Sequence, residues 1–315
     1  MFLLVIPIGF LILGMIILTF SSNKTVDHSV MLACNWSVPP IIIGLVLVSI
    51  GTDFPEIINS VISSSLDLGN INVGTSIGSA FSQVTLILGI IAIFLKQFEV
   101  NKKEVLIIGT SILLASILSF LIILDGYISR VDGLFLIICW VLFILIIRRI
   151  AKKDFSCPPR RESDRKHSGY NLIMVILGFI GVAIGTFLVI ESILEITRIL
   201  NISEFIASFF IASIGTSLPE LTVTLTALRK GQQELAIGDI MGSSLLDASI
   251  SIGIGPLLFP TTILGGPAIA TWIYTIITFF LVTLLLSIRG RVDKKVGLIC
   301  LSLYVFSYSL LSFVI

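Results

Sequence analysis

Residues 49–56 read Ser-Ile-Gly-Thr-Asp-Phe-Pro-Glu, and residues 213–220 read Ser-Ile-Gly-Thr-Ser-Leu-Pro-Glu, identical at six of the eight positions. Sliding the chain over itself by 164 residues aligns the two without a gap. The same register superposes a set of small and apolar residues further along: Gly74, Gly78, Ser79, Gly89 and Ile90 on Gly238, Gly242, Ser243, Gly253 and Ile254. A second echo, at a slightly different offset, pairs Arg130–Asp132 with Arg291–Asp293. The chain is therefore predicted to be a duplication.

The composition indicates that lipid is the solvent of this chain. Of its 315 residues, 56% are hydrophobic and 12% are charged, and the mean hydropathy is +1.12. Soluble domains carry about 25% charged residues. Apolar runs long enough for a bilayer, about 20 residues each, fill almost the whole length. A soluble domain of any size is excluded, and with a net charge of +1 nothing points to nucleic acid.

Hydropathy, read against Pro, Gly and charge, predicts ten spans. The first run has no basic n-region and no small-x-small cleavage site, so we expect a retained span rather than a signal peptide. The spans are expected near 1–22, 39–65, 71–95, 104–124, 131–149, 170–198, 204–228, 233–258, 267–288 and 295–314.

Charge orients these spans, because Lys and Arg collect in cytoplasmic loops. If the basic 148–168 loop is cytoplasmic, the loops on that side hold 18 of the 20 basic residues, and only Arg130 and Arg198 fall on the other side. The asymmetry supports the span count. It predicts a multi-pass protein of the cell membrane with both termini outside.

The predicted fold is an all-α integral membrane protein of two inverted five-helix repeats, with discontinuous helices at an ion site. We expect the first repeat at 1–150, a short basic loop at 151–169, and the second repeat at 170–315. Because five spans is an odd number, the two copies enter the membrane in opposite directions. Many secondary transporters follow this plan, with the substrate site at the repeat interface near the bilayer midplane.

Each repeated element places an acid inside an apolar span. Glu56 and Glu220 lie where ionisable groups are costly and by default functional. Pro55 and Pro219 lack an N–H, and their rings clash with the carbonyl four residues back. Carbonyls around residues 49–51 and 213–215 are therefore expected to leave the helix ladder. Such backbone is tolerated at membrane depth where it lines a cavity.

The surrounding groups offer only oxygen, the chemistry of hard cations such as calcium and sodium. Ser79 and Gln83 are four residues apart, as are Ser243 and Asp247, so each pair shares a helix face. Glycines at the same spacing would let these faces approach a neighbour closely. The candidate hydroxyl ligands near the breaks are Ser49, Thr52, Ser213, Thr216 and Ser217.

These motifs resemble the sodium/calcium exchangers of the cation/calcium antiporter superfamily, of the prokaryotic ten-span type. That family carries GTSLPE followed by a Gly-rich helix with Gly-Ser and an Asn or Asp four residues after that Ser. The resemblance implies alternating access, with sodium and calcium competing for one cluster of sites. Glu56 and Glu220 would be the principal calcium carboxylates. The remaining positions would complete the sites: Thr52, Thr216, Ser217, Ser79, Ser243, Asp247 and the carbonyls of Ser49 and Ser213.

The first repeat departs from this pattern at two positions. Asp53 stands where Ser is usual, and Gln83 stands where Asn is usual. Asp53 and Glu56 are three residues apart, so in a helix both would face the site. With Glu220 and Asp247 they make four carboxyl groups in a partly dehydrated space. Repulsion and burial favour the protonated form, so we expect some protonation in at least one transport state. Proton-coupled exchange of calcium or another cation therefore stays open.

Two other classes fit the sequence less well. An intramembrane aspartyl protease needs Gly-x-Gly-Asp, and the nearest string, Ala236–Asp239, lacks the first Gly. A passive channel usually builds its pore from oligomer symmetry, whereas the symmetry here lies within one chain. The roles of Glu191 and Glu195 stay undecided. We expect a transporter rather than an enzyme, with no prosthetic group and no obligatory protein partner. Its ligands would be calcium, sodium and possibly protons, within a lipid bilayer.

Overall fold

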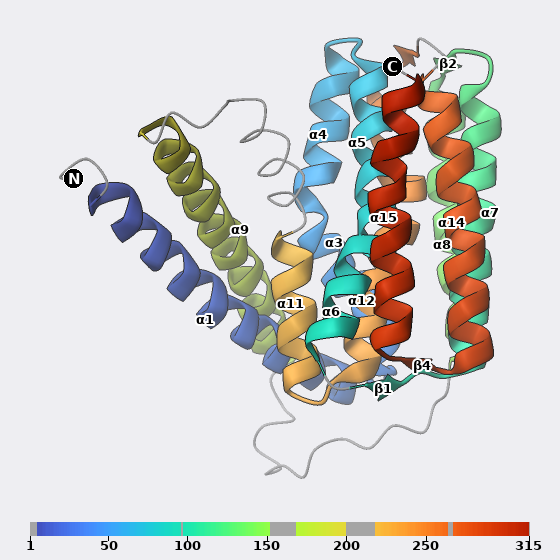
Figure 1. Cartoon of the computed structure of the whole chain (residues 1–315). Coiled ribbons are helices and arrows are strands. Elements are labelled where there is room, and N and C mark those ends of the chain that lie inside the picture. The colour runs from blue at the N-terminus through green and yellow to red at the C-terminus, as the bar shows by residue number, and fades with distance from the viewer. Residues whose placement is uncertain (1–4, 96, 152–167, 200–217, 264–266, 315) are drawn as a thin grey trace. The chain divides into compact units, whose positions relative to one another are not determined.

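The computed structural model describes residues 5–95, 97–151, 168–199, 218–263 and 267–314, and these residues are mostly helical (Figure 1). The chain forms two compact units. The first combines Met1–Ile43 with Lys153–Ala236, and the second combines Gly44–Lys152 with Ile237–Ile315. Each unit therefore contains segments from both halves of the sequence.

The first unit contains α1 (Val5–Trp36), α2 (Pro40–Ile43), α9 (Ser168–Ile199) and α11 (Leu218–Arg229). Helices α1 and α9 pack along each other through small residues. A Cβ on Gly181 would lie 2.1 Å from the Ser21 hydroxyl, and one on Gly178 would lie 2.2 Å from the Thr25 hydroxyl. Small residues let two helices approach this closely without a hydrophobic driving force between them.

Helix α1 corrects one sequence expectation, because the span predicted at 1–22 continues as helix to Trp36. The polar residues that suggested a connector have partners inside the first unit. Asp27 forms an ion pair with Lys230 at 2.9 Å, and the His28 Nδ1 lies 2.8 Å from the Asn171 Oδ1. Satisfied in this way, polar side chains do not end a helix.

The second unit contains the remaining elements. The bounds are η2 (Gly44–Val48, π-helical), α3 (Ser49–Thr52), α4 (Phe54–Ser65), α5 (Gly69–Ser82), η3 (Gln83–Ile87, π-helical), α6 (Leu88–Phe94), β1 (Phe98–Glu99), α7 (Lys102–Ile123), β2 (Tyr127–Ile128), α8 (Arg130–Ile150), α12 (Gln233–Leu246, whose first turn belongs to the first unit), η5 (Asp247–Ser251, π-helical), α13 (Ile252–Leu258), β3 (Thr261–Thr262), α14 (Pro267–Arg289), β4 (Arg291–Val292) and α15 (Lys294–Val314). Figure 1 shows α7 and α14 side by side along their length.

The repeat is visible in the elements themselves. Five pairs begin and end 164 residues apart: α4 and α11, α5 and α12, η3 and η5, α6 and α13, and α8 and α15. Residues with positive φ obey the same offset, Asp67 (54°) with Gly231 (73°) and Gly126 (79°) with Gly290 (63°). Strand β1 pairs antiparallel with β4, and β2 with β3. Each strand pair therefore joins one half of the sequence to the other.

The second sequence match, of Arg130–Asp132 with Arg291–Asp293, does not join equivalent positions of the fold. Arg130 and Asp132 lie in the first turn of α8, where Asp132 completes a capping box with Ser129. Arg291 lies in strand β4, and the Asp293 carboxylate accepts from the backbone N–H groups of Lys295 and Val296. Position 293 therefore corresponds to Ser129, because both side chains cap the last helix of their half. The matching residues therefore lie at different structural positions in the two halves.

Seven described helices are long and apolar enough to cross a membrane, and a bent pair makes an eighth. The pair joins Pro40–Thr52 to Phe54–Ser65 at 51°, within the span predicted at 39–65. The span predicted at 295–314 coincides with α15. The one predicted at 204–228 falls within the described residues only as α11. The count of ten stays a prediction.

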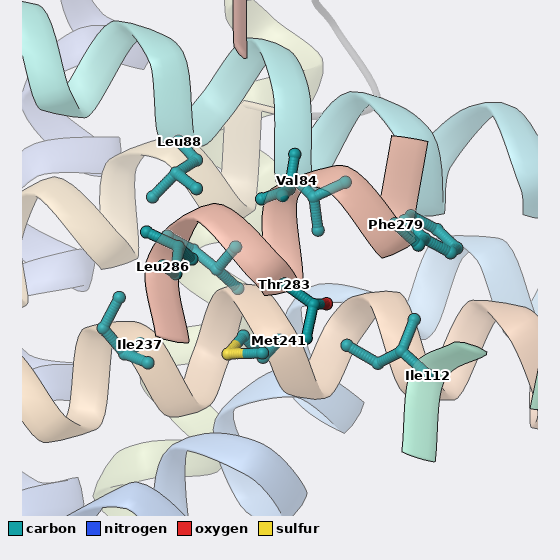
Figure 2. A pocket seen from close by; sticks show the side chains of 10 residues that line it. Val84, Leu88, Ile112, Ile237, Met241, Phe279, Thr283 and Leu286 are labelled. Carbon is teal, nitrogen blue, oxygen red and sulfur yellow. The ribbon is translucent and has the colours of Figure 1, made fainter. Parts of the chain in front are cut away.

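The core of the second unit is apolar and closely packed around Trp272, whose indole N–H donates to the Ser116 carbonyl at 3.0 Å. Figure 2 shows a second apolar region between η3, α6, α7, α12 and α14, lined by side chains such as Val84, Ile112, Met241 and Phe279. The space between them is about 10 Å³, roughly enough for one water molecule.

Candidate functional site

The first Gly-Thr-x-x-Pro-Glu element breaks its helix at Asp53. The backbone there has φ −85° and ψ 9°, between the end of α3 and the start of α4. The Asp53 N–H still donates to the Ser49 carbonyl at 2.9 Å, and the Thr52 hydroxyl donates to the same carbonyl at 3.2 Å. The break therefore lies later than expected. Pro55 withholds its N–H from the Gly51 carbonyl, four residues back, whereas the Ser49 carbonyl keeps its bond to the Asp53 N–H.

Glu56 lies in the first turn of α4, with only 6% of its surface exposed. Its Oε1 accepts from the Ser79 hydroxyl of α5 at 3.4 Å. Within the described part of the chain, Oε2 is buried with no hydrogen-bond partner. Burying a carboxylate oxygen costs free energy unless a donor or a cation compensates it. Glu56 and Ser79, predicted to act together, are thus in contact.

Gln83 links two further buried acids of the second unit. Its Nε2 lies 3.2 Å from the Asp53 Oδ1 and 3.2 Å from the Asp247 Oδ2. Its Oε1 accepts from the Ser244 hydroxyl at 3.0 Å, and the Ser251 hydroxyl donates to the Asp247 Oδ1 at 2.8 Å. All five side chains are fully buried. The structure therefore brings together Asp53, Gln83 and Asp247 from three separate segments.

A further buried acid lies next to the same helix break. The Thr52 hydroxyl lies 3.5 Å from the Asp239 Oδ1, and both residues are at most 1% exposed. Asp239 begins a series of four polar residues spaced by four along α12 and η5: Asp239, Ser243, Asp247 and Ser251. Such spacing places them along one helix face.

Sequence reasoning missed three of these residues as members of the site. Ser244 and Ser251 contact Gln83 and Asp247, and Asp239 contacts Thr52. The four-residue series was a signal that could have found Asp239 and Ser251. Ser244 lies off that face, and its role depends on a side chain from the other half of the sequence.

The small residues of α5 and α12 differ in their surroundings. A Cβ on Gly242 would lie 2.5 Å from the Leu45 backbone, so this close approach is real. No described atom lies within 4 Å of a Cβ built on Gly74 or Gly78. The expected close approach therefore occurs in the second repeat and is not made by described residues in the first. Ser243, in the same turn as Gly242, is fully buried.

The remaining predicted residues belong to the first unit. Glu220 lies in the first turn of α11 and is 1% exposed, matching Glu56 of α4. Ser213, Thr216 and Ser217 lie outside the described residues. Glu191 and Glu195 are exposed on α9.

Comparison with known proteins gives a consistent result. A family profile for "Sodium/calcium exchanger protein" matches residues 6–148 and 170–313. The inner membrane protein YrbG of Escherichia coli is 31% identical over 261 residues, which is 79% of each chain. The sodium/calcium exchanger MaX1 of Methanosarcina acetivorans is 22% identical, over 95% of this chain and 97% of its own.

A solved structure of the sodium-calcium exchanger NCX_Mj has the same fold. Its TM-score to this chain is 0.80 at 26% identity, over 97% of this chain and 99% of that one. The profile covers nearly the whole sequence, and both Gly-Thr-x-x-Pro-Glu elements, each with its buried glutamate, lie inside the matched regions. The chain belongs to the sodium/calcium exchanger family.

Proposed function

We propose that this protein is a secondary active antiporter that exchanges sodium for calcium by alternating access. The observation that carries the proposal is Glu56, a buried carboxylate at a helix break, with one oxygen that no described donor satisfies. A transported cation would compensate that oxygen. The family profile and the names of the relatives support the same ions.

Glu56 and its repeat equivalent Glu220 are the proposed principal calcium ligands. Calcium takes six to eight oxygens from carboxylates, carbonyls and hydroxyls, and the neighbouring groups of both repeats are oxygen donors. The proposed accessory positions are Ser49, Thr52, Asp53, Ser79, Gln83, Ser213, Thr216, Ser217, Ser243 and Asp247. Their relation by the 164-residue repeat supports this assignment.

The proposal extends to membrane placement. The protein would lie in the cell membrane with both termini outside and the 148–168 loop in the cytoplasm, as the distribution of Lys and Arg favours. Residues 1–150 and 170–315 would act as inverted repeats around the ion site. We propose transport without catalysis, prosthetic group or obligatory protein partner, which sets aside an intramembrane protease.

A proton-coupled calcium exchange is the second candidate. The observation that favours it is the fully buried pair Asp53 and Asp247, which share the Gln83 amide. Two neighbouring carboxyl groups out of water repel one another when both are ionised. A proton on one of them would relieve that repulsion.

Calcium flux in proteoliposomes tests both candidates. We expect uptake that depends on an opposing sodium gradient. Glu56→Gln and Glu220→Gln keep the side-chain volume but remove the charge, so each should weaken calcium binding at least about 100-fold, or about 2.8 kcal/mol. Glu99→Gln, on the exposed side of β1, is the matched control. Asp53→Ser restores the residue usual in the family and tests ion selectivity.

The outcomes separate the alternatives. Undiminished flux in both Glu→Gln variants would refute the site. Flux that ignores sodium but follows a pH gradient would replace sodium coupling with proton coupling. Flux without any counter-ion would indicate a channel.

A further inference from the structure

The Gln83 side chain is held at both ends. Its Nε2 donates to carboxylates on two different segments, Asp53 and Asp247, at the same distance of 3.2 Å. A primary amide carries two N–H donors, so one nitrogen can serve both acceptors. Gln83 is 0% exposed, as are both acids. The amide therefore lies between two buried carboxyl groups with no water required.

The two carboxylates fix the orientation of the amide. Oε1 accepts from the Ser244 hydroxyl at 3.0 Å. If the amide were turned over, its oxygen would face two carboxylates and its NH2 group would face the hydroxyl. Two acceptors would then oppose a third acceptor, which is unfavourable in a buried site. The two carboxylates thus select this orientation, whereas the Ser244 hydroxyl, which also lies 3.0 Å from the Ile240 carbonyl, can pair with either end of the amide.

This contact also lies where the two halves of the second unit meet. Gln83 and Asp247 are equivalent in the repeat, since they are 164 residues apart and each begins a π-helical segment. The next contact along the same helices, from the Ser244 hydroxyl to the Ala80 carbonyl at 3.4 Å, also joins residues 164 apart. Equivalent residues meet each other only close to the axis that relates the two copies. Gln83 therefore places a neutral donor beside that axis.

We propose that Gln83 acts on the ion site as a specificity-determining residue rather than as a direct ligand, and that its amide occupies the position between Asp53 and Asp247 that a monovalent cation would otherwise take. The proposal rests on the proposed exchange of sodium for calcium. With the amide in place, one cation fewer binds per cycle. A side chain one methylene shorter would release at least one carboxylate, and a sodium ion would then bind there.

The reason is the chemistry of the bridge. When Asp53 and Asp247 are both ionised they can only accept hydrogen bonds, so a group between them must then supply positive charge or N–H donors. A dehydrated sodium ion supplies charge and can leave with the transport cycle. The Gln83 amide supplies donors but is covalently attached to η3, so it cannot be carried across. A sodium ion and the Gln83 amide therefore cannot occupy the space between the two carboxylates at the same time.

The test measures sodium coupling in proteoliposomes for wild type, Gln83→Asn and the matched control Gln233→Asn, which makes the same change at an exposed position of α12. The readouts are the sodium Hill coefficient for calcium exchange and the sodium gradient that balances a fixed calcium gradient. We expect Gln83→Asn to raise the Hill coefficient and the sodium-to-calcium ratio by about one each. Gln233→Asn should match wild type.

Two further variants keep the proposal testable. Asp53→Asn in the Gln83→Asn background removes the released carboxylate, so the coupling ratio should return to that of wild type. If Gln83→Asn does not fold, as judged by gel filtration in detergent, Ser244→Ala loosens the amide at its other end and should raise the sodium dependence in the same direction. Unchanged coupling in a folded Gln83→Asn or Ser244→Ala protein would overturn the proposal.

Failure of the exchange function itself looks different. A wild-type protein that moves no calcium against sodium refutes the proposed function before any Gln83 variant is compared. Normal wild-type exchange with an unaltered ratio in Gln83→Asn refutes only the role of Gln83.

Discussion

Asp67 joins α4 to α5 with φ 54°, a backbone conformation that L-residues rarely adopt. Its Oδ1 accepts from the Thr262 N–H at 2.9 Å, the Thr261 hydroxyl at 3.0 Å and the Thr262 hydroxyl at 3.1 Å. These bonds, with the backbone N–H of Thr262 foremost, hold the pKa of Asp67 below its ordinary value. One exposed carboxylate thus ties this loop to strand β3.

Asp67→Asn should lower the thermal stability at neutral pH. Because the pKa is lowered in the folded state, the ionised carboxylate stabilises the fold above the unfolded pKa of about 4. That contribution is lost as the pH falls through the lower folded value. In a detergent melting series, the Tm difference between wild type and Asp67→Asn should be widest near neutrality and should narrow below about pH 4. A difference of the same size at every pH would contradict this account.

The buried acids could be predicted from the sequence, but the side-chain hydrogen bonds that link them could not. Burial of Glu56 and Asp247 follows from carboxyl groups inside apolar spans, and the contact of Glu56 with Ser79 follows from the paired motifs. The Gln83 bridge depends on the distance between two carboxylates on different segments. No spacing within one helix encodes that distance. The same limit hid Ser244, which contacts its partner across the repeat.

At the scale of elements, sequence signals predicted the helices better than their interruptions. Proline marked the break near Asp53 within about two residues. The π-helical segments η3 and η5 have no comparable signal, because an extra residue per turn is accommodated by packing and by side-chain contacts. The span predicted to end near residue 22 continues as helix to Trp36, because the polar side chains after residue 22 are satisfied by α9 and by Lys230.

Glycine contacts between helices allow a direct test of this packing. A Cβ on Gly133 of α8 would lie 2.4 Å from the Gly253 carbonyl of α13. The repeat-related pair, Gly297 and Gly89, is similarly close, with a Cβ on Gly297 3.0 Å from the Gly89 carbonyl. Gly133→Ala should therefore destabilise the protein by about 1–3 kcal/mol, because overpacking forces the helices apart.

Gly9→Ala is the control, because Gly9 lies exposed on α1, and no described atom lies within 4 Å of the added Cβ. It should leave stability unchanged or raise it by up to about 1 kcal/mol, the difference in helix propensity. Thermal unfolding in the same detergent compares the two variants. Equal Tm values for Gly133→Ala and wild type would show that α8 and α13 can move apart without loss of stability.

At the scale of the whole molecule, membrane topology connects span count to function. If the two halves are inverted repeats, each half has an odd number of spans, so we predict an even total with both ends on one side of the membrane. Seven spans, or eight with the bent pair, are counted among the described helices. Adding α15 and the span predicted at 204–228 to the eight gives the predicted ten. The distribution of basic residues then decides which side the ends occupy.

A tag at either terminus should therefore be accessible from outside in intact cells, and a cysteine introduced at Lys166 should react with an impermeant reagent only after the membrane is opened. The two ends must agree, because an odd span count would place them on opposite sides. It would also make the halves parallel or unequal, and Glu56 and Glu220 would no longer be related by inversion. Labelling of one terminus from outside and the other from inside would remove the symmetry argument for a shared cation site. Labelling of both from inside would keep that symmetry and reverse only the predicted orientation.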